Sequence, residues 1–344
     1  MVIAGPTAGG KSALAVHLAL ALAARGQHAE IITADAFQVY RRMDVGTAKP
    51  TPAERHGIAH HLIDLLEPAE PFTLDYWLKL AQQTIDRCRA RHVLPIVVGG
   101  THLYIKALLD GLFDGPAADL ALRAELAAMD PLARRELLIR VDPHAAARIH
   151  TNDLRRTVRA LEVFRLTGVP ISQHQQQWDR TTRGDALLVT LHWPVEAINP
   201  RINARVRAML AHGLVEETAS ILAHGGFGPQ AREALGYKQL LAFMQPHQLD
   251  AAREAALKPT SQALDHIAEE IKIATRRLAK SQRTWLRRLS ITPGALPLHP
   301  DAALDPLHPG AAPLERWSDQ IIAALNPPHG SAHSAANVAH PPTG

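Results

Sequence analysis

Eight residues near the start of the chain have the types and spacing of a phosphate-binding loop. They read Gly-Pro-Thr-Ala-Gly-Gly-Lys-Ser from Gly5 to Ser12, which matches G-x-x-x-x-G-K-[ST], a pattern whose backbone amides surround a polyphosphate. In such loops the lysine, here Lys11, neutralises the anion, and the hydroxyl, here of Ser12, reaches a bound Mg²⁺. A chance turn between a strand and a helix is the alternative. The apolar residues before the loop and the helix-forming residues 13–20 after it favour a polyphosphate site.

Two further polar residues follow apolar runs that are expected to be strands. Asp35 comes directly after Glu30–Ala34, and Thr101 comes after Leu94–Gly100. Because ligands of parallel sheets bind beyond the carboxyl ends of the strands, we expect Lys11, Asp35 and Thr101 around one crevice. Spacing alone leaves two interpretations of Asp35 open: a metal ligand or base, and a turn-forming aspartate. Thr101 is equally consistent with a ligand contact and with a helix N-cap.

The elements that would position these residues alternate along the chain. Apolar strands are separated by helical patterns such as Leu74–Arg91, which predicts an α/β fold with a phosphate-loop parallel sheet flanked by helices. An Ala/Leu/Arg-rich stretch then interrupts the alternation, and a strand follows it at 185–191. We therefore expect a catalytic core at 1–115 and 186–290, a helical insertion at 116–185, and a disordered Pro/Ala/His-rich tail at 291–344.

Composition narrows the class of protein. Of the 344 residues 47% are apolar, yet no uninterrupted apolar run is long enough to cross a bilayer. The single cysteine, Cys88, excludes an internal disulfide and a cysteine-cluster zinc site. We expect a cytoplasmic protein without membrane association, acting as a monomer.

A run of positive charge is unusual within the modest net charge of +4. Residues 272–288 contain seven Lys or Arg and no acid. At helical spacing, one face would carry the cations Lys272, Arg276, Lys280, Arg283 and Arg287. Another face would pack on the core through Ile267, Ile271, Ala274, Leu278, Trp285 and Leu289. A solvated helix face is the ordinary explanation, but the missing acids favour a nucleic-acid surface.

Several longer motifs occur in a characteristic order. The glycine loop is followed by Asp35-x-x-Gln-Val-Tyr, then by Met-Asp-Val-Gly-Thr-Ala-Lys-Pro at 43–50, and later by Gly-Gly-Thr-x-Leu-Tyr at 99–104. Further motifs lie at 152–163, 201–210, 234–238 and 275–287. In this order the chain resembles the tRNA dimethylallyltransferases (tRNA isopentenyltransferases, the IPP transferase family) from its first residue to about residue 288.

The resemblance implies a prenyl transfer. Dimethylallyl diphosphate would donate its dimethylallyl group to N6 of the adenosine on the 3′ side of the anticodon, in the anticodon stem-loop of a tRNA. Lys11, Ser12 and Mg²⁺ would stabilise the departing diphosphate. Arg205 matches an arginine that clamps the diphosphate, Asp35 matches the general base, and Thr101 matches a hydroxyl that contacts the target nucleotide.

The resemblance also assigns binding residues. The diphosphate or nucleotide site comprises Gly5, Pro6, Thr7, Ala8, Gly9, Gly10, Lys11 and Ser12, with Ser12 as the metal ligand. The tRNA-binding positions are Asp35, Ala36, Phe37, Gln38, Thr101, Arg123, Arg155, Arg156, Thr157, Val158, Arg159, Glu233, Ala234, Leu235, Gly236, Tyr237 and Lys238.

The sequence departs from the family pattern in two side chains. Ala36 stands where the family usually has serine, and Ser281 stands where a basic residue is usual. Two other functions share parts of these motifs: a small-molecule kinase that uses the same loop with ATP, and a non-catalytic RNA-binding protein. The kinase gives the basic run no role, and the intact Lys11, Asp35 and Arg205 disfavour the binding protein.

Overall fold

The computed structural model describes residues 1–112, 115–174, 186–244, 259–300 and 313–326. The chain divides into two compact units. Met1–Ile105 and Ala186–Gly344 form the core unit, and Lys106–Asp185 form the helical unit. The expected insertion at 116–185 therefore begins ten residues earlier, inside helix α4 (His102–Asp110). Within the described ranges, no helix has both the length and the apolar character that a membrane span requires.

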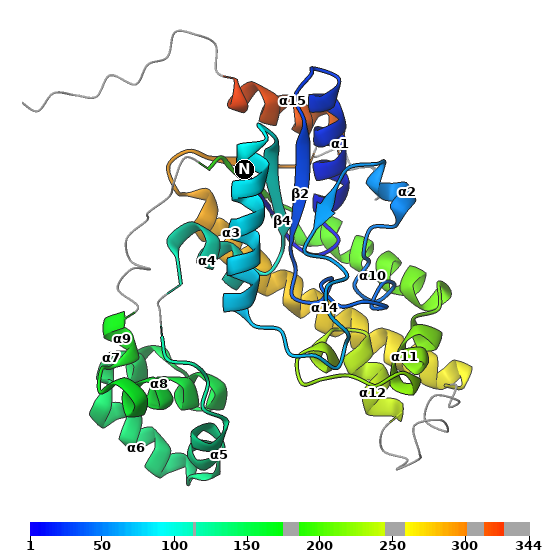
Figure 1. The fold of residues 1–344 in the computed structure, drawn as a ribbon. Helices are drawn as coiled ribbons and strands as arrows, with labels where there is room; N and C mark the ends of the chain where they lie inside the picture. Colours follow the sequence, from blue (N-terminus) through cyan, green and yellow to red (C-terminus); the bar gives the residue numbers. More distant parts are fainter. Residues whose placement is uncertain (113–114, 175–185, 245–258, 301–312, 327–344) are drawn as a thin grey trace, which may run out of the picture. The chain divides into compact units, whose positions relative to one another are not determined.

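A six-stranded parallel sheet forms the centre of the core unit (Figure 1). Its strands lie in the order β3-β2-β4-β1-β5-β6, and their bounds are Val2–Ala4 (β1), Ala29–Ala34 (β2), His60–His61 (β3), Leu94–Gly99 (β4), Leu188–Leu191 (β5) and Ala295–Leu298 (β6). Ile3 of β1 pairs with Val98 on one side and with Val189 on the other. This register confirms the expected parallel sheet and places the end of β1, where the glycine loop begins, near its middle.

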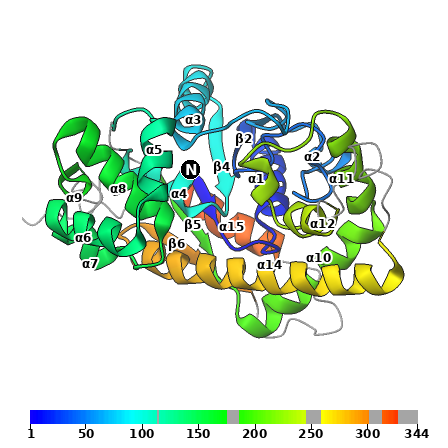
Figure 2. The same ribbon diagram turned by 90° about the horizontal axis from the view of Figure 1, so that it is seen from below.

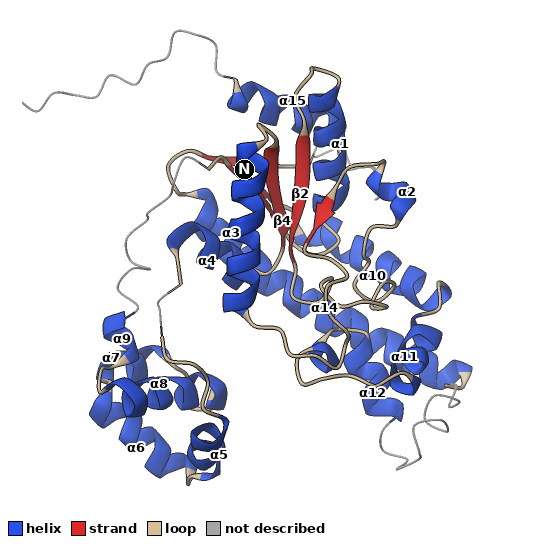
Figure 3. Ribbon diagram, viewed as in Figure 1, coloured by secondary structure: helices blue, strands red, loops and turns tan. Residues whose placement is uncertain are grey.

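Helices α1 (Lys11–Ala23) and α3 (Leu74–Ala90) flank the sheet (Figures 1 and 3). The chain crosses the sheet in one direction from β1 to β2 through α1, and in the opposite direction from β3 to β4 through α3, so right-handed connections place these helices on opposite faces. The expected helix Leu74–Arg91 is confirmed within one residue. The Thr73 side chain caps the first turn of α3. The indole of Trp77 in the same helix donates to the Thr33 carbonyl in β2.

The second half of the core unit is mainly helical. Its elements are α10 (Val195–Ala211), α11 (Leu214–Ala223), the 3₁₀ turn η2 (Ala231–Glu233), α12 (Tyr237–Met244) and α14 (Ser261–Ser290), with the short α2 (Pro52–Arg55) in the first half. Figure 2 shows α14 running unbroken along the unit. Its buried face is Ile267, Ala268, Ile271, Thr275, Ala279, Gln282 and Leu286.

This buried face corrects part of the sequence-based interpretation of α14. Leu278, expected in the core, is 42% exposed, and Ala274, Trp285 and Leu289 are only half-buried. The buried row follows the small or polar residues Thr275, Ala279 and Gln282 instead. This row of α14 is small or polar because the helix passes close to the glycine loop there. A short or hydrogen-bonding side chain fits at that contact, whereas a large apolar side chain does not.

The tail also differs from the expected disorder. Ala295–Leu298 forms β6, which pairs with β5 along its whole length. Leu314–Leu325 forms helix α15, whose Trp317 and Ile321 are fully buried. An apolar stripe of Leu314, Trp317, Ile321 and Leu325 is hidden in a Pro- and Ala-rich composition, which is why composition alone predicted disorder. Residues 301–312 and 327–344 of the expected tail lie outside the described residues.

The helical unit has a core of its own. Its helices are α5 (Leu120–Ala128), α6 (Pro131–Val141), α7 (Pro143–Arg148), α8 (Leu154–Thr167) and α9 (Ile171–His174). Aspartates cap four of them, because each carboxylate accepts first-turn amides: Asp119, Asp130, Asp142 and Asp153. Pro131 begins α6 and Pro143 begins α7, a position where proline lacks only an amide that the helix does not use. Residues 113–114 and 175–185 lie outside the described residues.

Candidate active site

The glycine loop links β1 to α1 through two residues in left-handed conformations. Ala8 has a φ of 58° and Gly10 a φ of 82°. Gly9 approaches the start of the loop so closely that a Cβ there would lie 2.9 Å from the Pro6 carbonyl oxygen. No side chain caps the N-terminus of α1. Its first amides, with the positive end of the helix dipole, are therefore directed to the space that the loop encloses.

Three side chains from the second half of the core unit hold this loop. The Trp193 indole donates to the Gly9 carbonyl at 3.1 Å, and Nε of Arg201 donates to the Ala8 carbonyl at 2.8 Å. Gln282 of α14 accepts from the Thr7 amide at 2.8 Å and donates to the carbonyl of Gly100 at 3.0 Å. The Arg201 guanidinium also lies over the Trp193 ring, 4.5 Å from its centroid. The loop shape therefore depends on residues far from it in sequence.

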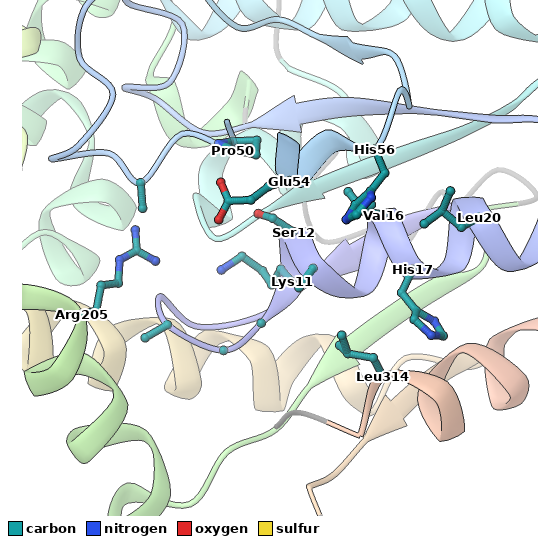
Figure 4. Close-up of a pocket in the computed structure, with 15 residues that line it drawn as sticks. Lys11, Ser12, Val16, His17, Leu20, Pro50, Glu54, His56, Arg205 and Leu314 are labelled. Carbon is teal, nitrogen blue, oxygen red and sulfur yellow. The ribbon is translucent and has the colours of Figure 1, made fainter. Parts of the chain in front are cut away.

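Lys11 and Arg205 supply two half-buried cations beside the loop. Nζ of Lys11 donates to the Pro6 carbonyl at 2.7 Å, and Nη2 of Arg205 donates to the Thr47 carbonyl at 3.3 Å. Burial lowers the pKa of Lys11 to about 8, with a further lowering by Arg205 that the charge of Asp35 opposes. Burial also lowers the pKa of Arg205. Figure 4 shows both side chains directed into one cavity, where an anion would relieve the repulsion between them.

Asp35 forms a turn and also lines a cavity. Its Oδ1 accepts from the amides of Phe37 at 2.9 Å and Gln38 at 3.3 Å, so it does form a turn. Oδ2 has no hydrogen-bond partner among the described residues, and the carboxylate lines a cavity that Lys11 and Arg205 also line. One oxygen therefore fixes the orientation of the group while the other remains available to a ligand.

The four residues proposed for catalysis line one cavity of about 410 Å³. Lys11, Asp35, Thr101 and Arg205 all contribute to its wall, together with Phe37 and Gln282. The expected convergence around one crevice is therefore observed. The Thr101 hydroxyl makes no hydrogen bond to the described residues, so the helix-cap alternative for its side chain is not observed.

A second cavity adjoins the first at the glycine loop. It has a volume of about 450 Å³, and Figure 4 shows its lining. Lys11, Ser12 and Arg205 line both cavities. The Ser12 side chain is exposed there and has no partner among the described residues. The two cavities therefore share the cations Lys11 and Arg205, and an anion bound to the glycine loop would be accessible from both cavities.

The 43–50 loop is fixed by a network that the sequence did not reveal. Glu217 of α11 accepts from the amides of three consecutive residues, Asp44 at 3.0 Å, Val45 at 2.8 Å and Gly46 at 3.1 Å. The Tyr237 hydroxyl donates to the same carboxylate. Gly46 packs against the Tyr237 ring so closely that a Cβ would overlap it. The contact between Glu217 and the loop amides follows no local pattern, because the acid and the loop are more than 170 residues apart in sequence.

Lys49 anchors the end of this loop from inside. Its side chain is almost fully buried and donates to the carboxylates of Asp44 and Asp64, both at 2.5 Å, and to the Tyr40 carbonyl at 2.7 Å. The lysine of the 43–50 motif therefore has a structural role. Thr47, the residue after Gly46, lines the cavity, and its carbonyl accepts from Arg205.

The expected RNA-binding positions in the core unit fall into two groups. Ala36, Phe37 and Thr101 line the catalytic cavity, Leu235 lines a smaller cavity that adjoins Asp35, and Glu233 and Lys238 are exposed and paired with each other at 2.6 Å. Gln38 also lines the catalytic cavity and Ala234 the smaller one, whereas Gly236 and Tyr237 are buried. Gln38 donates to the Thr47 carbonyl, so it supports the 43–50 loop.

In the helical unit, the expected RNA-binding arginines surround a buried acid. Glu162 is fully buried and accepts from Arg123 at 2.8 and 3.0 Å and from Arg159 at 2.6 Å. Arg155 and Arg156 are exposed, and Arg156 lies 3.5 Å from Asp153. Thr157 and Val158 are buried in the core of the unit, so their side chains do not offer RNA contacts. The sequence did not reveal that Arg123 and Arg159 pair with Glu162, because an Arg-rich helix has the same residue pattern whether or not its arginines contact a buried acid.

The basic run on α14 is less uniform than its sequence suggested. Lys272 pairs with Glu269 one turn earlier at 2.6 Å, and Arg276 donates to Asn203 of α10 at 3.0 Å. Arg283 is half-buried, whereas Lys280 and Arg287 are exposed. The exposed part of the stripe is therefore its C-terminal half.

Comparison with known proteins gives consistent matches. A family model described as IPP transferase matches residues 38–289, and one described as isopentenyl transferase matches residues 1–65. A tRNA dimethylallyltransferase of Syntrophobacter fumaroxidans is 42% identical over 83% of this chain and 80% of its own length. One of Moorella thermoacetica is 44% identical over 83% and 86%, respectively.

Two solved structures share the fold. A full-length tRNA isopentenylpyrophosphate transferase from Bacillus halodurans is 32% identical and superposes with a TM-score of 0.62, over 94% of this chain and 95% of that one. A eukaryotic dimethylallyltransferase acting on tRNA is 27% identical with a TM-score of 0.74, over 94% and 79%.

Proposed function

Since this chain belongs to the IPP transferase family, we propose that it transfers a dimethylallyl group from dimethylallyl diphosphate to tRNA. The acceptor is N6 of the adenosine on the 3′ side of the anticodon, and diphosphate is released. The observation that supports this most is the single cavity lined by Lys11, Asp35, Thr101 and Arg205. It combines a site for an anionic leaving group with a carboxylate for an attacking amine.

The leaving group is the first chemical requirement. As the bond between the dimethylallyl carbon and the diphosphate oxygen breaks, its electron pair passes to the diphosphate. The half-buried Lys11 and Arg205 and the uncapped amides of α1 face this growing charge. Because these groups are already oriented and poorly solvated, they stabilise the charge more than water does.

Removal of a proton is the second requirement. The exocyclic amine of adenine is a weak nucleophile, and its nitrogen must lose a proton as the new N6–carbon bond forms. Asp35 lines the cavity, its Oδ2 is unpartnered among the described residues, and its Oδ1 accepts from two backbone amides. Asp35 accepts the N6 proton in this mechanism.

Mg²⁺ fits the site as a partner of the diphosphate. The exposed Ser12 hydroxyl lies where the glycine loop meets α1, and Mg²⁺ commonly binds to one or two protein groups together with substrate phosphates. When bound, the ion would neutralise charge on the leaving diphosphate. Among the described residues, the grouped potential metal ligands are Glu30, His61 and Cys88, and there Arg91 already pairs with Glu30.

The acceptor must leave its stack to reach this cavity. An adenine in the anticodon loop is stacked on its neighbours, and enzymes that modify such bases extrude them. Phe37, Thr101 and Leu278 line the cavity and suit an apolar base with polar edges. Nothing in this scheme requires a second copy of the chain, so we propose that it acts as a monomer.

The direct test is to incubate the protein with dimethylallyl diphosphate, Mg²⁺ and unmodified tRNA, digest the tRNA and analyse its nucleosides by mass spectrometry. We expect N6-dimethylallyladenosine at the position next to the anticodon, and none with Lys11→Ala. The kinase alternative finds no support in the family match. ADP formation from ATP without tRNA, in place of the prenylated nucleoside, would restore it.

A further inference from the structure

Helix α15 lies against the helix that begins at the glycine loop. It packs along α1 (Figure 1), where His17 and Ser318 are hydrogen-bonded at 2.9 Å. Trp317 and Ser318 are buried at this contact. The IPP transferase match ends at residue 289, so this helix lies outside it.

A chain of contacts connects α15 to the loop itself. The Trp317 ring packs edge-on against Trp193, with ring centroids 6.1 Å apart and an interplanar angle of 86°. Trp193 in turn donates to the Gly9 carbonyl. The Trp317 indole is fixed from the other side, because it donates to the His299 carbonyl at 3.0 Å. Two buried indoles thus lie between the C-terminal helix and a carbonyl of the glycine loop.

The first residue of α15 also reaches the cavity. Leu314 is half-buried and lines the second cavity together with Gly9, Lys11 and Val16 (Figure 4). It is an apolar side chain on the wall of a cavity that Lys11 and Arg205 also line. Excluding water from this cavity strengthens the attraction between Lys11 and a bound anion.

We infer that α15 is a positioning element for the prenyl diphosphate. It fixes the glycine loop through Trp317 and Trp193 and covers the flank of the loop with Leu314. The affinity for the diphosphate then depends on this C-terminal helix, whereas binding of tRNA does not. This inference rests on the proposed function only for the identity of the donor, because the anion site itself is independent of the reaction.

A matched pair of leucines on α15 provides the test. Leu314 and Leu325 are both half-buried and stand at opposite ends of the same helix, but only Leu314 lines the cavity. Binding of inorganic diphosphate with Mg²⁺ is measured by calorimetry for Leu314→Ala and Leu325→Ala in the full chain. The KM for dimethylallyl diphosphate, the Kd for tRNA and the Tm are measured in parallel.

Leu314→Ala should weaken diphosphate binding and raise the donor KM about threefold to tenfold, with kcat and the tRNA Kd unchanged. Leu325→Ala should leave both donor parameters at the wild-type value. Trp193→Phe keeps an aromatic ring but removes the hydrogen bond to Gly9, and it should weaken diphosphate binding by roughly fivefold. If Leu314→Ala does not fold, Trp193→Phe decides.

Equal diphosphate affinities for the two leucine variants, or wild-type affinity in Trp193→Phe, would overturn the inference. A joint loss of Tm and of tRNA binding would also overturn it, because it would show a purely structural helix. These outcomes are separate from a failure of the proposed function. If the wild-type protein binds diphosphate but prenylates no tRNA, the function is wrong while the role of α15 is still measured.

Discussion

Replacement of Asp35 separates its turn-forming role from its proposed role as a base, because Oδ1 accepts from two backbone amides whereas Oδ2 has no partner among the described residues. Asp35→Asn keeps an oxygen that accepts from the Phe37 and Gln38 amides but cannot take up the N6 proton. Asp35→Ala loses both functions. Loss of a general base costs about a hundredfold or more in rate, which is about 2.7 kcal/mol. Loss of the two turn hydrogen bonds costs about 1 kcal/mol each in stability at most.

We therefore expect both variants to lose at least about a hundredfold in the single-turnover rate of tRNA prenylation. Only Asp35→Ala should also melt at a lower temperature, by a few degrees, since about 1 kcal/mol corresponds to 2–4 °C in a unit of this size. Removing the negative charge leaves Lys11 and Arg205 less compensated. Diphosphate binding by Asp35→Asn should thus be as tight as in the wild type or tighter.

The assay is rapid-quench prenylation at saturating donor with enzyme in excess over tRNA, with tRNA binding measured separately by filter retention. A single-turnover rate of Asp35→Asn within tenfold of the wild type would refute the base role. Weaker diphosphate binding by Asp35→Asn would refute the expectation that the Asp35 charge opposes anion binding by Lys11 and Arg205.

Four further results are expected. Because the pKa of Lys11 is lowered to about 8 and its charged form binds the diphosphate, donor affinity should fall as the pH rises through about 8; a KM that stays flat to pH 9.5 contradicts this. Gly46→Ala has no room for its methyl group and should lower both the Tm and kcat/KM, while normal kinetics would show that the 43–50 loop tolerates displacement. Glu162→Ala leaves two arginines without their buried partner and should destabilise the helical unit by about 3 kcal/mol, seen as an early transition in calorimetry. Removing the exposed charges of Lys280 and Arg287 together should weaken tRNA binding and reduce the slope of log Kd against log salt by up to about 2; an equal effect from a control pair on α3 would show that only net charge matters. That control pair is Lys79→Ala with Arg89→Ala.

Sequence patterns predicted those parts of the fold and of the site that depend on residues close together in the chain. Continuous apolar runs identified β1, β2, β4 and β5, and the glycine spacing identified the loop before α1. The rule that ligands bind beyond the carboxyl ends of parallel strands placed Lys11, Asp35 and Thr101 around one crevice, and the structure does so. The two-residue strand β3 and the strand β6 were missed because neither has a run long enough to show a period.

The sequence did not predict which side chains hold the loops of the site in place. Gln282, Trp193 and Glu217 act on backbone groups of loops that lie more than 170 residues away in the chain. Such contacts have no spacing signature, since any polar side chain at the right place can make them. The same limit explains Tyr237 and Val158, which were assigned to RNA by position although they pack inside their units.

The position of β1 in the sheet has a consequence for synthesis. Its neighbour on one side, β4, leaves the ribosome early, whereas β5, its neighbour on the other, follows only after the whole helical unit. At ordinary translation rates this leaves one edge of β1 unpaired for on the order of ten seconds. Nascent chains should need a chaperone during that interval. Because Trp193, Arg201 and Gln282 emerge later still, a half-made chain has the glycine loop without the side chains that hold it.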